Sequence, residues 1–428
     1  MKYSCPDCGI LPVNHKIAYW SIVVNWFFWP LTCLSDKLFS KFAHRLEPLI
    51  SDYLASKLLK FFARLGIAKI KTEPDAQDEL MLQCMWEEAI KRGIKIEEFI
   101  LLNKRRGICI AYYKERIGRR RPPVSGLRHN CLYQYFFLKN PDKQLICCFD
   151  RLPRPLEISQ SINWMDNKSI LKKKFIQAGI PVARGQAVFC FGSAKKVFHS
   201  LGKPVIVKPH IGSGSRHTIM HIIDEGELVS AVNCAKKLSP LVIIEEELIG
   251  PVYRITSIGG KIVGIIRRDK PQVFGTGRST IKSLVEKENQ NIKRQGPLFS
   301  KILIDEEAEL ELKRQNLTWM AIPKKGQAIT FNQKINWSLG GTTTDVTDSV
   351  HPDNIELFEK ITLFLGDPLI GIDFIIADMT KSWTNQPRCG VIECNSLPFI
   401  DNHHFPFNGQ PRNAAGALWD IIFPESGN

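Results

Sequence analysis

Two short apolar runs near the C-terminal end constrain the fold most, because each carries polar groups inside a buried-strand pattern. They are residues 371–378 (GIDFIIAD) and 390–398 (GVIECNSLP). Apolar, β-branched runs of this length are typical of strands that are buried on one or both faces. Such strands normally exclude charge, yet Asp373 interrupts the first run, and Glu393 and Asn395 interrupt the second.

These three positions predict a cluster of oxygen ligands. Residues two apart on a strand point to the same face, so Glu393 and Asn395 share a side. Asp373 joins them if the two runs pair as a hairpin. Two carboxylates and an amide oxygen, with room for waters, are how Mg²⁺ is held in many ATP-using enzymes. The alternative is a hairpin that has an Asx turn and a glutamate whose hydrogen bonds are made within the protein, with no metal.

The composition is typical of an ordered globular protein. Its 428 residues, 44% hydrophobic and 24% charged, are enough for two or three domains and contain no low-complexity tract or fixed repeat. The net charge of +15 lies mostly in the first 160 residues and suits ATP, an acidic substrate or an anionic membrane surface. No nucleic-acid partner is expected, because no recognised binding motif is present.

Twelve cysteines are spread over the whole length, which favours reduced thiols in the cytosol. Cys5 and Cys8 form a lone CxxC. With His15 or Cys33 this pair suits zinc, but no second pair follows, and ordinary thiols are the alternative.

An apolar, aromatic-rich stretch at residues 17–34 marks the N-terminal segment, residues 1–70. Three readings stay open for it: an interfacial membrane contact, a helix packed on the core, or a single span. Tryptophans followed by Lys37 and Arg45 favour the interface. The protein is therefore expected in the cytoplasm, with membrane association left open.

Residues 71–160 predict a small α/β domain. An amphipathic helix over 75–92 has an acidic first turn and a basic last turn. Strand patterns follow at 96–102, 107–113 and 144–150.

The remainder, residues 161–428, begins with features suited to phosphate. A strand over 203–209 carries Lys208 and runs into a glycine- and hydroxyl-rich loop at 210–217, which can wrap phosphate oxygens. That loop matches neither a Walker A loop nor GxGxxG. The next buried-type strand, 241–248, ends in three glutamates; one can accept from an adenine amino group, and a plain acidic loop is the alternative.

Further along, a hairpin over 259–268 ends in adjacent arginines, which suit phosphate or carboxylate unless they are a solvated strand end. Helices are predicted within 281–318 and over 352–365. Between them, the loop 336–348 is rich in glycine and hydroxyl groups, so its backbone can approach a ligand closely.

Taken in order, these features resemble the ATP-grasp carboxylate–amine ligases over roughly residues 160–424. The sequence is most similar to the ATP-grasp part of cyanophycin synthetases and bifunctional glutathione synthetases. The most specific pieces are the runs 340–353, 371–373, 393–395 and 402–412.

The resemblance implies an α+β (α/β) fold in which two subdomains grip ATP, about 185–250 covering the nucleotide. It implies a ligase that uses ATP and Mg²⁺, or Mn²⁺, to join a small-molecule carboxylate and an amine through an acyl phosphate. A homo-oligomer is expected. The Mur-ligase-like and glutamate–cysteine ligase halves are missing, so cyanophycin synthesis itself is not expected. A non-catalytic, membrane-associated ATP-binding protein of the same fold is the alternative.

Residue roles are also carried over from the resemblance. It implies that Lys168 and Lys208 hold the ATP phosphates under a loop containing Gly212, Ser213, Gly214 and Ser215. Glu245, Glu246 and Leu248 match the adenine segment, and Asp373, Glu393 and Asn395 match the metal ligands. Arg267 or Arg268 would act with Lys208 at the acyl phosphate. The substrate contacts would be Arg216, Arg254, Asn336, Gly341, Thr342 and one of His403 and His404.

Three departures from the family pattern stand out. An acid usually follows the hinge to hold the ribose, but here the match gives Pro251 and Val252. Asn167 stands where the family often has Asp, and His217 lies in a less glycine-rich loop. The ribose contact is the one placed in doubt.

Overall fold

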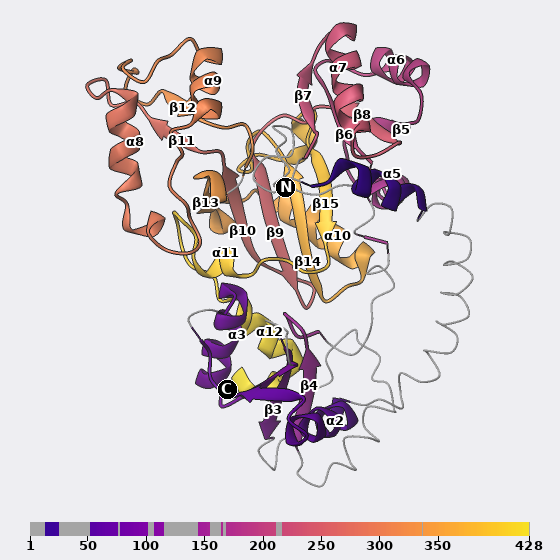
Figure 1. The fold of residues 1–428 in the computed structure, drawn as a ribbon, viewed down its shortest axis with the longest axis vertical. Coiled ribbons are helices and arrows are strands. Elements are labelled where there is room, and N and C mark those ends of the chain that lie inside the picture. Colours follow the sequence, from indigo (N-terminus) through magenta and orange to yellow (C-terminus); the bar gives the residue numbers. More distant parts are fainter. Residues whose placement is uncertain are drawn as a thin grey trace.

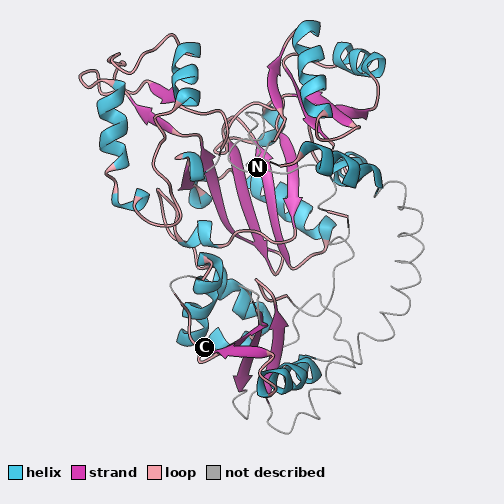
Figure 2. Cartoon of the chain, viewed as in Figure 1, coloured by secondary structure: helices cyan, strands magenta, loops and turns pink. Residues whose placement is uncertain are grey.

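The computed structural model describes residues 13–24, 52–75, 78–101, 107–114, 144–154, 164–165, 168–210, 216–335 and 337–427, and the statements below concern these residues. Around a central sheet stand two smaller units at the upper corners and a third unit below (Figure 1). Figure 2 shows the same view by secondary structure. Several sequence predictions lie outside the described residues: Cys5, Cys8, 25–34, Asn167, 212–215 and Asn336.

The lower unit is built on a four-stranded antiparallel sheet. Its strands are β1 (Ala68–Lys71), β2 (Lys95–Leu101), β3 (Ile108–Lys114) and β4 (Gln144–Phe149), in that spatial order. This arrangement confirms the strands that the sequence predicts at 96–102, 107–113 and 144–150.

Helices cover both faces of this sheet. Alternate residues point to opposite faces of a strand. One side packs under α2 (Asp52–Arg64), and the other packs against α3 (Leu80–Lys91) and α12 (Ala414–Ile422). Trp419 of α12 is fully buried and donates its indole N–H to the Met85 carbonyl at 3.0 Å. The lower unit therefore contains chain from both ends of the protein.

The central sheet has five antiparallel strands. In spatial order they are β13 (Thr342–Asp345), β10 (Lys261–Asp269), β9 (Val252–Ile258), β14 (Leu369–Ile375) and β15 (Gly390–Asn395). One face packs against α10 (Pro352–Leu365), with α5 (Lys168–Gln177) beside β15, in one apolar cluster.

Helix α10 follows its local sequence signals. Proline is tolerated in the first turn because that backbone N–H has no helical partner. The His351 ring accepts from the Asp353 amide, and Gly366 ends the helix in the left-handed conformation, φ 64°. The helix predicted over 352–365 is confirmed.

The upper unit on the α6 and α7 side holds a four-stranded sheet, called the small sheet below. Its strands lie in the order β5 (Gly185–Val188), β8 (Val242–Glu246), β6 (Val205–Pro209) and β7 (Ile219–Ile222). Helices α6 (Phe191–Ser200) and α7 (Glu225–Lys236) pack on it in one core (Figure 1).

The opposite upper unit pairs β11 (Gln272–Phe274) with β12 (Ala328–Thr330) under α8 (Ile281–Asn289) and α9 (Glu306–Arg314). These helices confirm the prediction over 281–318. Short elements complete the fold: α11 (Asp401–His404), η3 (Ile292–Arg294), η4 (Trp337–Leu339), η5 (Thr347–Ser349), η6 (Trp383–Asn385) and η7 (Pro424–Gly427).

Residues 15–24 form a further helix, which begins two residues before the apolar stretch predicted at 17–34 and includes its first part. Among the described residues no helix is long and apolar enough to cross a membrane.

Candidate functional site

One row across the central sheet brings three predicted site residues together. Arg254 of β9 lies opposite Asp373 of β14, and Asp373 lies opposite Glu393 of β15. Residues paired across antiparallel strands point to the same face, so all three share a side. The next row on that face is Thr256, Gly371 and Asn395. The hairpin that the sequence predicts between the two C-terminal runs is confirmed.

Two arginines hold Asp373. The Nε and Nη2 atoms of Arg254 both donate to its carboxylate, the latter at 3.0 Å, and Arg268 Nη1 lies 3.4 Å from Oδ2. Only 2% of Asp373 is exposed. Burial alone would raise the pKa of Asp373, but the positive charges of Arg254 and Arg268 outweigh it and lower that pKa. Asp373 is therefore a buried, ionised carboxylate.

Gly371 leaves room for this arrangement. A Cβ atom at that position would lie 3.0 Å from Arg254 Nη1 and 3.0 Å from the Pro398 ring. Such contacts are tighter than most Cβ contacts in proteins, so a larger side chain at this position would press on the Arg254 guanidinium.

Glu393 differs from Asp373 in its exposure. Its side chain is 33% exposed; Lys168 Nζ lies 3.5 Å from one carboxylate oxygen, and Asn395 Nδ2 lies 3.4 Å from the other. No group of three or more His, Cys, Asp and Glu side chains suited to a metal occurs among the described residues. The oxygen set here is two carboxylates and one amide.

A second charged cluster lies in the small sheet. Lys172 of α5 and Lys208 of β6 both donate to Glu245 of β8, whose side chain is 4% exposed. Burial would raise the pKa of Glu245, but Lys208 and Lys172 outweigh it and lower that pKa. Burial lowers the pKa of Lys172 in spite of its carboxylate partner. Glu245 is thus engaged by two lysines instead of lying open as an adenine acceptor.

Helix α5 links the two clusters. Lys168 and Lys172 are four residues apart, so they lie one turn apart on the same helix face. Lys168 contacts Glu393 of the central sheet, and Lys172 contacts Glu245 of the small sheet. The sequence singled out Lys168 but missed Lys172, although the i, i+4 spacing is a usable signal.

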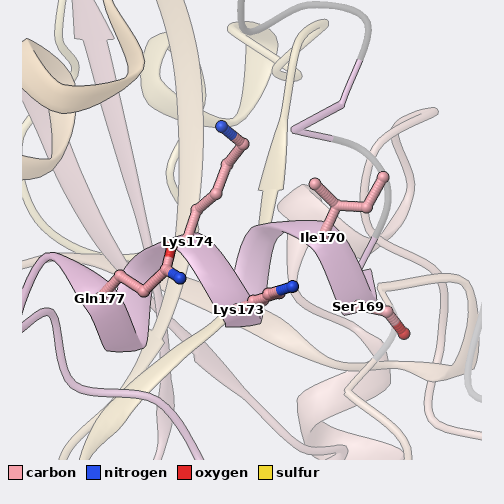
Figure 3. Close-up of a pocket in the computed structure, with 5 residues that line it drawn as sticks. All are labelled: Ser169, Ile170, Lys173, Lys174 and Gln177. Carbon is pink, nitrogen blue, oxygen red and sulfur yellow. The ribbon is translucent and has the colours of Figure 1, made fainter.

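A surface hollow of about 530 Å³ lies along another part of α5. Figure 3 shows the residues that line it: Ser169, Ile170, Lys173, Lys174 and Gln177. None of these is a predicted site residue. Lys174 is engaged over the Trp164 ring at 4.6 Å, and Ser169 Oγ lies 2.6 Å from His210 Nε2. We assign the functional site to the charged clusters and not to this hollow.

The two adjacent arginines of β10 point to opposite faces of the sheet, because successive side chains alternate along a strand. Arg268 lies near Asp373, as described above. Arg267 points to the other face of the sheet, where its Nε donates to Asp269 at 2.8 Å. Of the two arginines predicted at the acyl phosphate, only Arg268 is brought to the carboxylates.

The structure also shows where the other residues predicted to bind the nucleotide or substrate lie. Glu246 is held by Arg184, whose Nε and backbone N–H both donate to it, at 3.0 and 3.1 Å. Leu248 is buried just after β8. Arg216 lies within the predicted phosphate loop, of which residues 211–215 are outside the described residues.

On the predicted substrate side, Gly341 is buried, and Thr342 opens β13 opposite Asp269, on the face of Arg267. Its neighbour Thr343 lies opposite Arg268 instead. Sequence reasoning missed Trp337, whose ring lies 5.5 Å from the Arg268 guanidinium.

The structure distinguishes the two histidines. His403 is fully buried, and its Nε2 lies 2.7 Å from the Thr256 hydroxyl, on the site face. Burial, aided by Arg254, lowers the pKa of His403 to about 3, so it is neutral. His404 instead accepts the Ala415 amide at 3.0 Å, near the start of α12. His403 is therefore the histidine next to the site.

Comparison with known proteins places this geometry in context. No protein-family model matches the chain. Cyanophycin synthetase from Trichormus variabilis is 30% identical over 262 residues, covering 60% of this chain and 29% of that protein. The glutathione biosynthesis bifunctional protein GshAB from Mannheimia succiniciproducens is 32% identical over 273 residues, covering 61% of this chain and 36% of that protein.

A solved structure shows the fold. A bifunctional glutathione synthetase from Pasteurella multocida has a TM-score of 0.58 and 24% identity, covering 82% of this chain and 44% of that one. The chain spans about a third of the length of the curated relatives that it matches. The similarity and the α+β fold predicted from the sequence are confirmed.

Proposed function

We propose that this chain, whose fold is the ATP-grasp fold, is an ATP-dependent carboxylate–amine ligase. The carboxylate takes the terminal phosphoryl group of ATP, giving an acyl phosphate and ADP. An amine then attacks the acyl carbon, phosphate leaves, and the amine loses a proton as the amide forms. The observation that carries the proposal is the row of Arg254, Asp373 and Glu393, with Lys168 against its open end.

The oxygen set fits a hard divalent cation. Asp373, Glu393 and Asn395 lie on neighbouring positions of one face, and carboxylate and amide oxygens are the ligands that Mg²⁺ prefers. A carboxylate offers about four acceptor positions, so Asp373 can keep its arginines and still contribute an oxygen. Bound there, Mg²⁺ or Mn²⁺ would neutralise phosphate charge during transfer.

The basic side chains supply the remaining charge compensation. Lys168 and Lys208 are positioned by α5 and β6, and each now contacts a carboxylate that a triphosphate would compete with. Arg268 lies beside Asp373 and is the positive group suited to stabilise charge on the acyl phosphate. Such a reaction needs mainly positioning and charge stabilisation, which this arrangement offers.

The substrates, the cellular compartment and the contacts with partners complete the proposal. The substrates are an amino acid or a short peptide, since cyanophycin synthetase and glutathione biosynthesis proteins are the relatives found. The setting is a reducing compartment, as the spread of twelve cysteines over the whole length of a chain of this size favours. A homo-oligomer and a membrane contact through residues 17–34 are also expected.

Product analysis tests this function. The full chain is incubated with MgATP and pooled amino acids and dipeptides, and phosphate release and product masses are followed. We expect phosphate release only when a carboxylate and an amine are both present, with a product equal to their masses minus one water. Phosphate release that no pool stimulates, with no new mass, would contradict the proposal.

A further inference from the structure

Two histidines far apart in the sequence meet ring to ring. His15 belongs to the N-terminal helix of residues 15–24, and His217 precedes β7 in the small-sheet unit. Their Nε2 atoms lie 3.2 Å apart, and their rings cross at 88° with centroids 4.7 Å apart. The contact is independent of the carboxylate row and of the Glu245 cluster.

The proton arrangement of His217 leaves its Nε2 able to coordinate a metal. Its Nδ1 lies 2.9 Å from the Cys234 carbonyl oxygen. A carbonyl oxygen can only accept, so Nδ1 carries the hydrogen, and in the neutral ring Nε2 carries the lone pair that faces His15. A histidine whose second nitrogen donates to a backbone carbonyl is the usual form of a metal ligand.

The backbone of His217 is held in an unusual conformation. Its φ is 52°, in the left-handed region that residues other than glycine seldom occupy, and only 1% of the residue is exposed. Such conformations persist where the surroundings fix them, and they concentrate at functional positions. Burial and the contact of Nδ1 with the Cys234 carbonyl oxygen hold the ring with Nε2 directed at His15.

The separation of the two nitrogens matches tetrahedral coordination. Zinc binds histidine nitrogen at about 2.0–2.1 Å, so two such ligands at the tetrahedral angle lie roughly 3.3 Å apart. The observed 3.2 Å needs almost no movement to admit the ion.

The sequence supplies the other ligands. Cys5 and Cys8 form a CxxC pair, and Cys8 precedes His15 by seven residues. Seven residues span at most about 23–25 Å, so both thiols are within reach of the histidines. These cysteines lie outside the described residues.

We propose that His15, His217 and the thiolates of Cys5 and Cys8 bind one structural zinc ion. The ion ties the N-terminal helix to the small-sheet unit. Four protein ligands close the coordination sphere, so the site has no position for a substrate. Two thiol protons are released as the ion binds.

Metal analysis of the full chain tests the site. The protein is produced with added zinc, without a histidine tag, and desalted without chelator. We expect about one zinc per chain, and an about tenfold or greater loss in H15A, H217A and the double variant C5S/C8S. H199A and C190S are the matched controls, because His199 and Cys190 are exposed residues of the same unit. Both should keep the zinc.

Cobalt substitution identifies the ligands. The wild-type chain loaded with Co²⁺ should show the thiolate-to-cobalt charge-transfer band and a tetrahedral ligand-field spectrum. The charge-transfer band should vanish in C5S/C8S. If H217A does not fold, H15A decides, because its residue lies on the separate N-terminal helix. Wild-type protein without bound zinc, or undiminished zinc in H15A or in C5S/C8S, would overturn the proposal.

Discussion

Asp373 of β14 lies directly between Arg254 of β9 and Glu393 of β15 in one row of the central sheet. Arg254 compensates the charge of Asp373 inside the protein, whereas Glu393 stays partly exposed beside Lys168. The row therefore has a buried, structural end and an open end. That asymmetry separates variants that affect folding from variants that affect ligand binding.

Replacing Arg254 should destabilise the fold. R254M leaves the buried Asp373 carboxylate with only the weaker Arg268 contact, and loss of one partner of a buried ion pair costs about 3–5 kcal/mol. Urea unfolding measures the effect. The matched control is R267M on the neighbouring strand β10, because the Arg267–Asp269 pair is partly exposed and contributes at most about 1 kcal/mol. Equal losses in the two variants would refute this role of Arg254.

Lys172 should matter more than its neighbour on α5. K172M removes one of two lysines on buried Glu245, so we expect a loss of about 1–3 kcal/mol in unfolding free energy. K173M alters an exposed lysine one residue away and should change stability little. Equilibrium denaturation of both variants decides, and a larger loss in K173M would count against the cluster.

The buried histidine predicts an acid-sensitive stability. The pKa of His403 is about 3 in the fold and 6.5 in the unfolded chain, so the unfolded state binds the proton first as pH falls. Its contribution is complete above pH 6.5 and declines below it, by about 2 kcal/mol at pH 5. Denaturation at pH 7 and pH 5 should show a smaller drop in H403Q than in the wild type.

His404 loses stability over an overlapping range, since burial lowers its pKa to about 4. H404Q should therefore reduce the drop as well. H199Q, which changes an exposed histidine, should leave it unchanged. A wild-type drop that neither H403Q nor H404Q reduces would contradict this assignment.

The sequence predicts features whose signals are local. The hairpin of β14 and β15 follows from two apolar runs with polar interruptions, and α10 follows from proline at its start and glycine at its end. The similarity to ATP-grasp ligases adds the order of these elements along the chain. Together they are enough to place Asp373, Glu393 and Asn395 on one face.

Contacts between distant segments are not predictable in the same way. Arg254 meets Asp373 only because β9 pairs with β14 in one register, and a shift of one residue would turn it to the apolar face. The same phase argument separates Arg268 from Arg267. Trp419 in the lower unit depends on tertiary packing that no sequence window contains.

Calorimetric titration with a non-hydrolysable ATP analogue tests the central claim most directly, namely that Asp373, Glu393 and Asn395 hold a divalent cation on the nucleotide. We predict that the wild-type chain binds the analogue at least about tenfold more tightly with Mg²⁺ than with EDTA, and that E393Q loses this difference while it stays folded. The control E359Q, an exposed position of α10, should keep it. Equal binding by the wild type with Mg²⁺ and with EDTA, or full magnesium dependence in E393Q, would contradict the account.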